Sequence, residues 1–266
     1  MRVPSLKVSI PVWSVLAALL PAPGPAQWIK VPPVQIPRTA GGAPDLSAPA
    51  PRLPNGKPDL SGSWSPDDNR YARDIALDLK PEDVPYQPWA KALFDQRKDG
   101  SHSREDPDAH CLPQGVPKID SLAYPWKVIQ QPGYIAIIYE TFTYWRQIFM
   151  DGREVEADPN PTWMGYSTGK WDGDTLVIDT RGFNGKAWLD QLGRPSTARL
   201  HVIERFRRTD FGHMTMDITI DDKGAYTKPF TMYGHSALQQ KTELMEYICN
   251  ENNVDVSHIV GKDSRK

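Results

Sequence analysis

The sequence predicts an all-β fold, an antiparallel up-and-down barrel with one or two short helices. From Tyr124 onward, short runs of alternating apolar and polar residues follow one another, as in strands joined by hairpins. The clearest turn signal is Asp172-Gly173, which predicts a type I′ hairpin within residues 162–183. The other turn signals are Pro132-Gly133, Asp151-Gly152, Phe211-Gly212 and Lys223-Gly224.

Residues 1–26 have the features of a secretory signal peptide. A basic start is followed by an apolar stretch over residues 8–20, and Gly24-Pro25-Ala26 matches the small-x-small pattern of a cleavage site. The apolar stretch is too short to span a bilayer as a helix and contains Pro11. We therefore expect cleavage before Gln27, a periplasmic or secreted protein, and no stable membrane insertion afterwards.

Residues 27–58 are rich in proline, alanine and glycine and have almost no apolar periodicity. Such a segment buries too little surface to offset its ordering entropy, so we predict a disordered leader, and we detect no internal repeat. A single barrel domain is predicted over residues 59–256, with an amphipathic helix near residues 88–98. The last strand is predicted at residues 243–248, and residues 257–266 form a disordered tail.

Charge and motif content restrict the possible partners. The chain has 31 Lys and Arg against 33 Asp and Glu, with a formal net charge of −2, and its densest basic run, Arg205 to Arg208, fits a solvated strand face better than a nucleic-acid site. The histidines show no metal-ligand spacing, and there is no glycine-rich phosphate loop. We expect a small-molecule partner, no nucleic acid, no metal and no cofactor; the oligomeric state is left open.

The chain has two cysteines, Cys111 and Cys249. In an exported protein they are expected to form one disulfide. Closing a loop of this size stabilises a protein by roughly 4–5 kcal/mol in the chain-entropy model, less any strain.

Two charged residues fall on apolar faces of predicted strands. Glu204 shares a face with Val202 and Phe206, and Arg146 shares a face with Ile148. Because a buried carboxylate is costly without a partner, Arg146 is the natural partner of Glu204. The two residues either form a structural ion pair or face a ligand, and both interpretations remain open.

Other candidate site residues are weaker. Asp179 either lines the lumen or faces water. Glu140, which follows Ile138 before a turn, has a weaker case than Glu204 for an inward position that is either structural or ligand-facing. Tyr144 is a further candidate ligand contact. An aromatic and polar set in loops near one end of the strands is expected either to form a barrel mouth that holds a sugar or a flat apolar ligand, or to cap the barrel core. This set comprises Trp163, Tyr166, Phe183, Asn184, Trp188 and Asp190.

Gly62-x-Trp64 on the first strand is a feature of lipocalin-like or calycin-like barrels, in which the tryptophan closes one end. Across nearly the whole mature chain, the sequence resembles a large family of exported bacterial β-barrel-like proteins, common in soil bacteria. The resemblance implies export and no particular activity. Many members have Pro-His-Ser before the ERF strand, where this chain has Pro-Ser-Thr at residues 195–197. The shared motifs are DLSGSW at 59–64, CLPQGVP at 111–117, GKWDGDTLVIDTRGFN at 169–184, ERF at 204–206 and CNEN at 249–252.

The primary interpretation is an exported barrel protein that binds a small amphipathic or aromatic molecule in its cavity, with Arg146 and Glu204 as polar anchors. A first alternative is a lyase, isomerase or hydrolase in which Glu204 or Asp179 acts as general base and Arg146 stabilises an oxyanion. A second alternative is a carbohydrate-binding or envelope-interaction module that uses a flat aromatic face.

Overall fold

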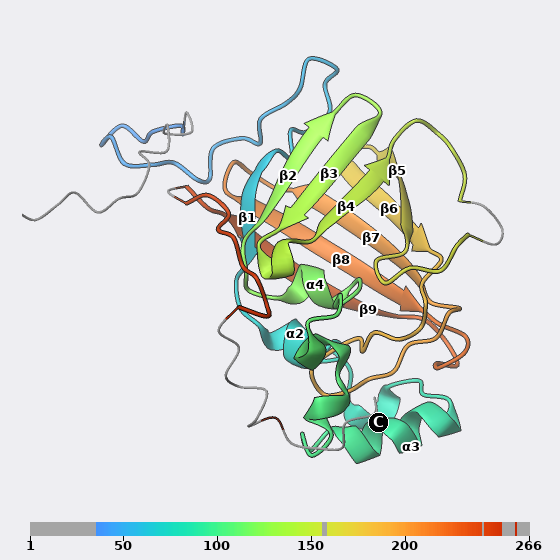
Figure 1. The fold of residues 1–266 in the computed structure, drawn as a ribbon. Coiled ribbons are helices and arrows are strands. Elements are labelled where there is room, and N and C mark those ends of the chain that lie inside the picture. The colour runs from blue at the N-terminus through green and yellow to red at the C-terminus, as the bar shows by residue number, and fades with distance from the viewer. Residues whose placement is uncertain (1–35, 156–158, 241, 252–258, 260–266) are drawn as a thin grey trace, which may run out of the picture. The chain divides into compact units, whose positions relative to one another are not determined.

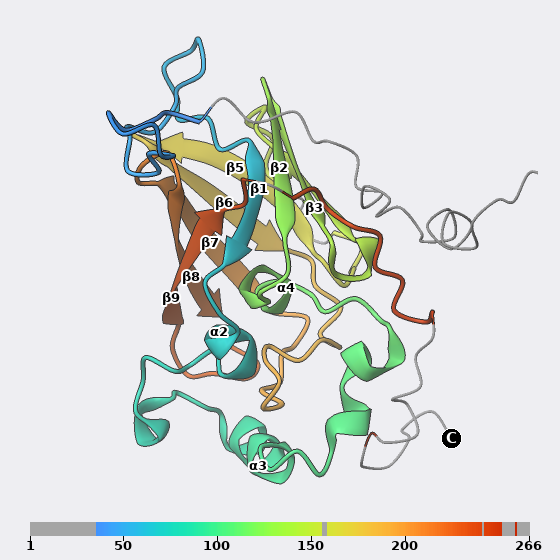
Figure 2. The same cartoon turned by 90° about the vertical axis from the view of Figure 1, so that its left-hand side faces the viewer.

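The computed structural model describes residues 36–155, 159–240, 242–251 and 259, and within them nine strands close one barrel (Figures 1 and 2). Each strand pairs with its neighbours in the chain, and β1 closes the barrel against β9. The predicted signal peptide, the start of the leader and nearly all of the tail lie outside the described residues. The strands are β1 Gly62–Pro66, β2 Trp126–Gln131, β3 Tyr134–Tyr139, β4 Trp145–Phe149, β5 Tyr166–Asp172, β6 Thr175–Arg181, β7 His201–Arg208, β8 His213–Asp221 and β9 Phe230–Leu238.

Short helices gather at one end of the barrel, where α4 lies beside the strand ends and α2 and α3 lie further out (Figures 1 and 2). The α-helices are α2 Arg70–Arg73, α3 Pro88–Arg97 and α4 Lys118–Ser121, and the 3₁₀ helices are η2 Pro81–Asp83, η3 Ser103–Glu105, η4 Pro107–His110 and η5 Thr141–Thr143. The predicted helix near residues 88–98 is confirmed as α3, which begins at a proline as helices often do. No helix in the described part of the chain is long and apolar enough to cross a membrane.

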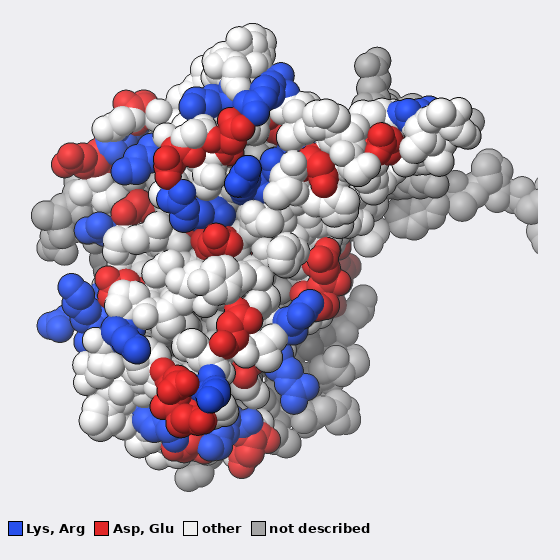
Figure 3. All heavy atoms as spheres, turned by 180° about the vertical axis from the view of Figure 1, so that it is seen from behind, with Lys and Arg blue, Asp and Glu red and all other residues white. Residues whose placement is uncertain are grey.

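The inward-facing side chains, which alternate strictly with outward-facing ones along the strands, fill the barrel interior. In β8, Met216 and Ile218 are at most 1 % exposed, whereas Asp217 between them faces outward. Burying one such side chain contributes about 1.5–3 kcal/mol. Basic and acidic side chains are interspersed on the face of the molecule in Figure 3. On the outward face of β7, Arg205 pairs with Asp172 at the end of β5 at 2.7 Å.

Trp64 closes one end of the barrel. Its ring is fully buried and its indole N–H donates to the carbonyl of Leu60 at 2.9 Å. The guanidinium of Arg208 lies 5.0 Å from the ring centre and donates to the carbonyl of Asp59 at 2.6 Å. This end of the barrel is therefore filled by an aromatic ring and a cation.

The pairing differs from the predicted antiparallel barrel at one place, because β4 and β5 are parallel. Parallel neighbours need a long crossover connection, and here residues 150–165 return the chain to the end of the barrel at which β4 began. The strand predicted at residues 243–248 is also absent: this segment is extended without ladder pairing. It is fixed instead by individual bonds and by the disulfide.

The β5–β6 hairpin also differs in detail from the predicted type I′ turn. Asp172 pairs with Thr175, so the two loop residues are Gly173 and Asp174. Of these, only Gly173 has a positive φ, +59°. A glycine at the first loop position with an ordinary residue after it is the pattern of a type II′ turn, which suits the strand twist equally well.

The described part of the predicted leader, residues 36–58, is ordered against the end of the barrel that Trp64 closes. The carbonyl of Leu46 accepts from the Gly212 N–H at 2.8 Å, and that of Ala48 accepts from the Phe211 N–H at 2.7 Å. This segment therefore differs from the disordered leader predicted from composition. Turn hydrogen bonds and contacts with hairpin tips replace the missing apolar periodicity.

Candidate functional site

Arg146 on β4 and Glu204 on β7 meet inside the barrel. Arg146 Nη1 donates to Glu204 Oε1 at 2.8 Å, and Nη2 donates to Oε2. The two residues are 3 % and 0 % exposed. The predicted inward orientation of both is therefore present, and they are paired with each other.

Two further donors of Arg146 are also used. Its Nε donates to Ser167 Oγ at 2.9 Å and its Nη2 to Thr180 Oγ1 at 2.5 Å, so that four of the five N–H groups are bonded. Burial by itself lowers the pKa of Arg146, but Glu204 more than offsets this, so that the pKa lies above its ordinary value. The guanidinium is thus a permanent charge in the core.

Asp120 on α4 completes this cluster and was missed by sequence reasoning. Its Oδ1 accepts from the Tyr139 hydroxyl at 2.6 Å, while its Oδ2 lies 3.7 Å from Arg146 Nη1 and has no hydrogen-bond partner among the described atoms. Burial, aided by the charge of Glu204, raises the pKa of Asp120 to about 7. The cluster therefore contains one carboxyl that binds a proton near neutral pH. A four-residue helix has no periodicity from which this inward position follows.

Lys118 anchors the other side of α4. Its Nζ donates to Asp106 Oδ2 at 2.7 Å and lies 3.4 Å from Asp108 Oδ2, with its side chain 1 % exposed. Burial by itself lowers the pKa of Lys118. The two neighbouring carboxylates raise this pKa by more than burial lowers it, so that the net change is upward. This ion pair holds the loop before α4 in place.

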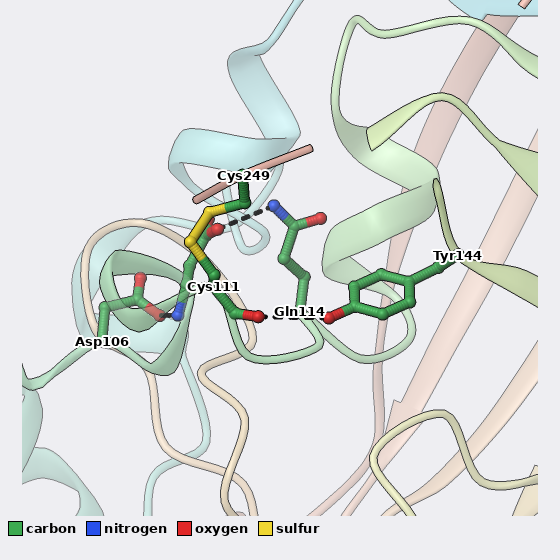
Figure 4. The surroundings of a disulfide bond; sticks show 6 residues. Asp106, Cys111, Gln114, Tyr144 and Cys249 are labelled. Atoms are coloured by element: carbon green, nitrogen blue, oxygen red, sulfur yellow. Dashed lines mark hydrogen bonds between the residues drawn. A yellow bond between two sulfur atoms is a disulfide. The ribbon is translucent and has the colours of Figure 1, made fainter. Parts of the chain in front are cut away.

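The predicted disulfide is present between Cys111 and Cys249, with the Cα atoms 5.5 Å apart (Figure 4). Beside it, the Tyr144 hydroxyl donates to the carbonyl of Cys111 at 3.3 Å. Glu140 Oε2 accepts from the Met245 N–H at 2.9 Å. Tyr144 and Glu140, both predicted to contact a ligand, thus tie the disulfide region and the C-terminal segment to the barrel.

Three residues of the predicted mouth, Phe183 among them, are enclosed by protein. Asp190 is 0 % exposed; its Oδ2 accepts from the Ile75 N–H at 3.0 Å and also pairs with Arg194. Trp188 is 5 % exposed, and the Arg97 guanidinium lies 4.4 Å from its ring centre. Their contacts in the described structure fix loops.

The other mouth residues are partly exposed. Tyr166 stacks on Phe149 with ring centres 5.2 Å apart, on the barrel exterior. Asn184 Oδ1 accepts from the Lys186 N–H at 3.0 Å within its own loop. For Trp163, no side-chain hydrogen bond is present within the described residues. Trp163 and Asn184 lie on adjoining segments, because the Asn184 N–H donates to the carbonyl of Thr162 at 2.8 Å.

Asp179 points outward from β6, next to His201 and Arg181. Asp179 Oδ2 lies 3.0 Å from His201 Nε2, without hydrogen-bond geometry, and Oδ1 accepts from Arg181 Nε at 3.0 Å. Burial raises the pKa of Asp179, but these two neighbours lower it by more, so that the net change is downward. An ionised, weakly basic carboxylate is poorly suited to act as a general base near neutral pH.

A pocket of about 550 Å³ opens at the barrel end where β2 turns into β3. Three strands and the loop 53–55 line it, and none of the lining side chains is ionisable. Its apolar lining residues are Leu53, Pro54, Pro132, Ile135, Met150 and Trp171, and its polar lining side chains are the amides of Asn55, Gln130 and Gln131.

A smaller hollow of about 330 Å³ lies where β1 leaves β9. Its floor includes Met216, Met232 and the side-chain-free Gly234, and it reaches Ser121 on α4, next in the chain to Asp120. Asp67, Asp68 and Arg70 form part of its charged rim. This hollow is the nearest surface opening to Asp120 among the pockets we describe.

The described fold is a closed, mostly antiparallel barrel with one disulfide and a buried ionic cluster. Within the described residues, no three His, Cys, Asp or Glu side chains are grouped so as to hold a metal ion. No protein-family model matches the chain, and no curated protein matches it significantly.

Proposed function

We propose that this protein binds an uncharged amphipathic or aromatic small molecule in the barrel-end pocket lined by Trp171. The observation that carries the proposal is the chemistry of the lining, in which apolar side chains are combined only with amides. Ligand sites are concave and mostly apolar, with a few polar groups that fix orientation, and occupy roughly 300–1,000 Å³. The pocket of about 550 Å³ lies within this range.

The lining also favours a neutral ligand. An ionised group placed there would lose its hydration without gaining a charged partner from the lining. The Gln131 amide and the Asn55 NH2 group can bond polar groups of a neutral ligand, whereas the Gln130 amide already bonds the Leu60 N–H at 2.8 Å and the Pro58 carbonyl at 3.2 Å. Trp171 offers an indole face for stacking. The proposed ligand is therefore flat or apolar, with hydroxyl, carbonyl or amide groups.

Access depends on the loop of residues 53–55, which we call the strap. Arg52 donates to both carboxylate oxygens of Asp174, at 2.9 and 2.6 Å, and Lys57 Nζ donates to the Gly173 carbonyl at 3.1 Å. Exposed ion pairs contribute only about 0–1 kcal/mol. The strap is thus held closely enough to shape the pocket and weakly enough to open for a ligand.

We place this activity outside the cytoplasm, in the periplasm or the surrounding medium. The Cys111–Cys249 disulfide fits an oxidising compartment.

The test uses the neutral dye N-phenyl-1-naphthylamine and native mass spectrometry of the mature protein from its own host. We expect saturable dye fluorescence, with affinity reduced about tenfold in Trp171→Leu because a stacking and burial contact is lost. Trp145→Leu is the matched control, since Trp145 is 62 % exposed, and it should bind as wild type does. A folded wild type that binds no dye and carries no small molecule would overturn the proposal.

A second candidate function, acid–base catalysis, is favoured by Asp120. Its pKa of about 7 suits a general acid or base, and the hollow that reaches Ser121 lies nearby. In this version Asp120 takes the role that the sequence suggested for Glu204. Conversion of the co-purified molecule by wild type, but not by Asp120→Asn, would support an enzyme; unchanged release from both would support a binding protein.

A further inference from the structure

Residues 37–47 and 51–61 are two copies of one short motif. They read PRTAGGAPDLS and PRLPNGKPDLS, sharing Pro-Arg at the start, a glycine in the middle and Pro-Asp-Leu-Ser at the end. The proline-rich composition hides this repeat, which corrects the sequence-based finding of none. The repeat is short enough to be a single turn in each copy.

The two copies fold into the same turn. Arg38 Nη1 donates to the Gly42 carbonyl at 2.7 Å, and Arg52 Nη1 donates to the Gly56 carbonyl at 2.8 Å. Both glycines have φ of +80°, a conformation that favours glycine. Equivalent backbone bonds close each turn: Asp45 N–H to Pro37 O at 2.7 Å and Asp59 N–H to Pro51 O at 2.9 Å, with isolated bridges Arg38–Pro44 and Arg52–Pro58.

The bond to the glycine carbonyl orients the guanidinium in each turn. In the second copy, Arg52 then presents Nη1 and Nη2 to the two carboxylate oxygens of Asp174 at the β5–β6 hairpin tip. This fork-to-carboxylate geometry is the strongest form of an arginine ion pair. The second copy is therefore an arginine turn that binds an aspartate in a Gly-Asp hairpin.

The first copy presents the same device without that partner. Arg38 is exposed, as are residues 39–44 of its turn, and no acidic side chain pairs with Arg38 anywhere in the described ranges. Ile36 and Leu46, at the two ends of the segment that carries this turn, pack against the core, while the turn between them is exposed. Figures 1 and 2 show this part of the chain at the periphery of the barrel end. Its guanidinium is held in orientation with free donors facing outward.

We propose that the Arg38 turn is a docking site for an aspartate in a Gly-Asp hairpin turn on another protein. The intramolecular Arg52–Asp174 contact shows which chemistry this motif binds. Alignment of the copies also shows what the first lacks: Ala43 stands where Lys57 contacts the Gly173 carbonyl. The first copy thus keeps the arginine that contacts the carboxylate in the second copy, and lacks the lysine that forms the second anchor.

The missing second anchor limits the affinity that we expect for the Arg38 turn. One exposed carboxylate contact alone gives a dissociation constant of roughly 0.1 M or weaker. A partner with several such hairpins would gain affinity because the later contacts form within one complex. The site therefore fits a transient or multivalent partner.

The test titrates the full mature chain with a disulfide-cyclised peptide containing the sequence of residues 170–175, KWDGDT, and follows the arginine Nε–H resonances by NMR. We expect a concentration-dependent shift of the Arg38 resonance, which is assigned by its loss in Arg38→Gln, and no comparable shift of the other exposed arginines. Ala43→Lys should tighten binding several-fold by restoring the second anchor. Arg199→Gln, which removes another exposed arginine, is the matched control and should leave the titration unchanged.

Three results would each overturn the docking site: no shift of Arg38, an equal response to a peptide with asparagine replacing its second aspartate, or an equal response to sodium acetate at the same concentration. A shift of Arg52 in place of Arg38 would likewise count against it, because the peptide would then be displacing Asp174. Far-ultraviolet circular dichroism of each variant verifies that the barrel is folded. None of these readouts depends on the barrel-end pocket.

Discussion

Arg146 and Glu204 lie 58 residues apart in the chain and form a two-bonded ion pair across the interior of the barrel. The strands that carry them, β4 and β7, are separated by β5 and β6 in the sheet. Ser167 on β5 and Thr180 on β6 bond to the same guanidinium. One arginine thus fixes the relative register of four adjacent strands.

Removing one partner of this pair should cost more than removing both. Glu204→Leu leaves the charge of Arg146 buried, and we expect about 3–5 kcal/mol lower free energy of unfolding. The double variant Arg146→Met/Glu204→Leu should recover part of this loss. Urea denaturation of the full double-mutant cycle measures the coupling, and Arg205→Gln at the surface pair with Asp172 should cost less than about 1 kcal/mol. Additive costs for the two buried substitutions would contradict the pairing.

Asp120→Asn should make the protein less sensitive to pH. Asp120 has a folded-state pKa of about 7 against 3.8 for the free side chain. Between these values the folded protein holds a proton that the unfolded chain has released, so stability falls as the pH rises through this window. Asparagine resembles the protonated form and removes that slope.

The measurement is the free energy of unfolding of Asp120→Asn minus that of wild type, at several pH values from 4 to 8. This difference should rise with pH by up to roughly 1.4 kcal/mol per unit and level off above pH 7. Asp172→Asn is the control, because Arg205 lowers the pKa of Asp172 and its contribution is complete well below neutral pH. A flat difference for Asp120→Asn would show that Asp120 is ionised throughout.

The inward position of Glu204 could be predicted because strand alternation is a local property with a period of two. The same rule placed Arg146 on an inward face and made it the expected partner. Asp120 escaped this reasoning because α4 is a single turn between loops. Its position depends on how the loop before it packs, to which the Lys118–Asp106 pair contributes.

The positions of loop residues likewise could not be predicted from strand alternation. Trp188 and Asp190 lie in a loop with no period, and their aromatic and acidic character fits a ligand site and a packed loop equally well. The composition of residues 36–58 predicted disorder, because it does not reveal the turns in which an arginine side chain bonds a glycine carbonyl. The parallel β4–β5 pair depends on the path of the long connection after β4. The Asp151-Gly152 turn signal at the start of that connection does not specify where the connection ends.

Replacing both cysteines by serine should loosen the C-terminal segment. The disulfide spans 138 residues of sequence, and we expect the free energy of unfolding to fall by about 2–5 kcal/mol. Limited proteolysis should then cleave within residues 242–250 before it cleaves the barrel, because the remaining contacts there are the Glu140–Met245 bond and the packing of Tyr247 on Tyr124 and Phe142, with no strand pairing. Wild type treated with reductant should behave like the variant. Equal resistance of oxidised and reduced protein would contradict this role.

Gly185→Ala should destabilise the loop between β6 and β7 more than a left-handed glycine alone would. Gly185 has φ of +68°, and an added Cβ would lie 2.5 Å from the Ala198 backbone nitrogen and 2.7 Å from the Thr197 carbonyl carbon. Gly100 is the matched control, since it has φ of +82° with no heavy atom within 4 Å of an added Cβ. Gly100→Ala should cost about 1 kcal/mol from backbone strain, whereas Gly185→Ala should cost a further 1–3 kcal/mol, roughly, because backbone atoms must move. Thermal and urea unfolding measure both variants, and equal losses would mean that the 185–198 contact is not tight in solution.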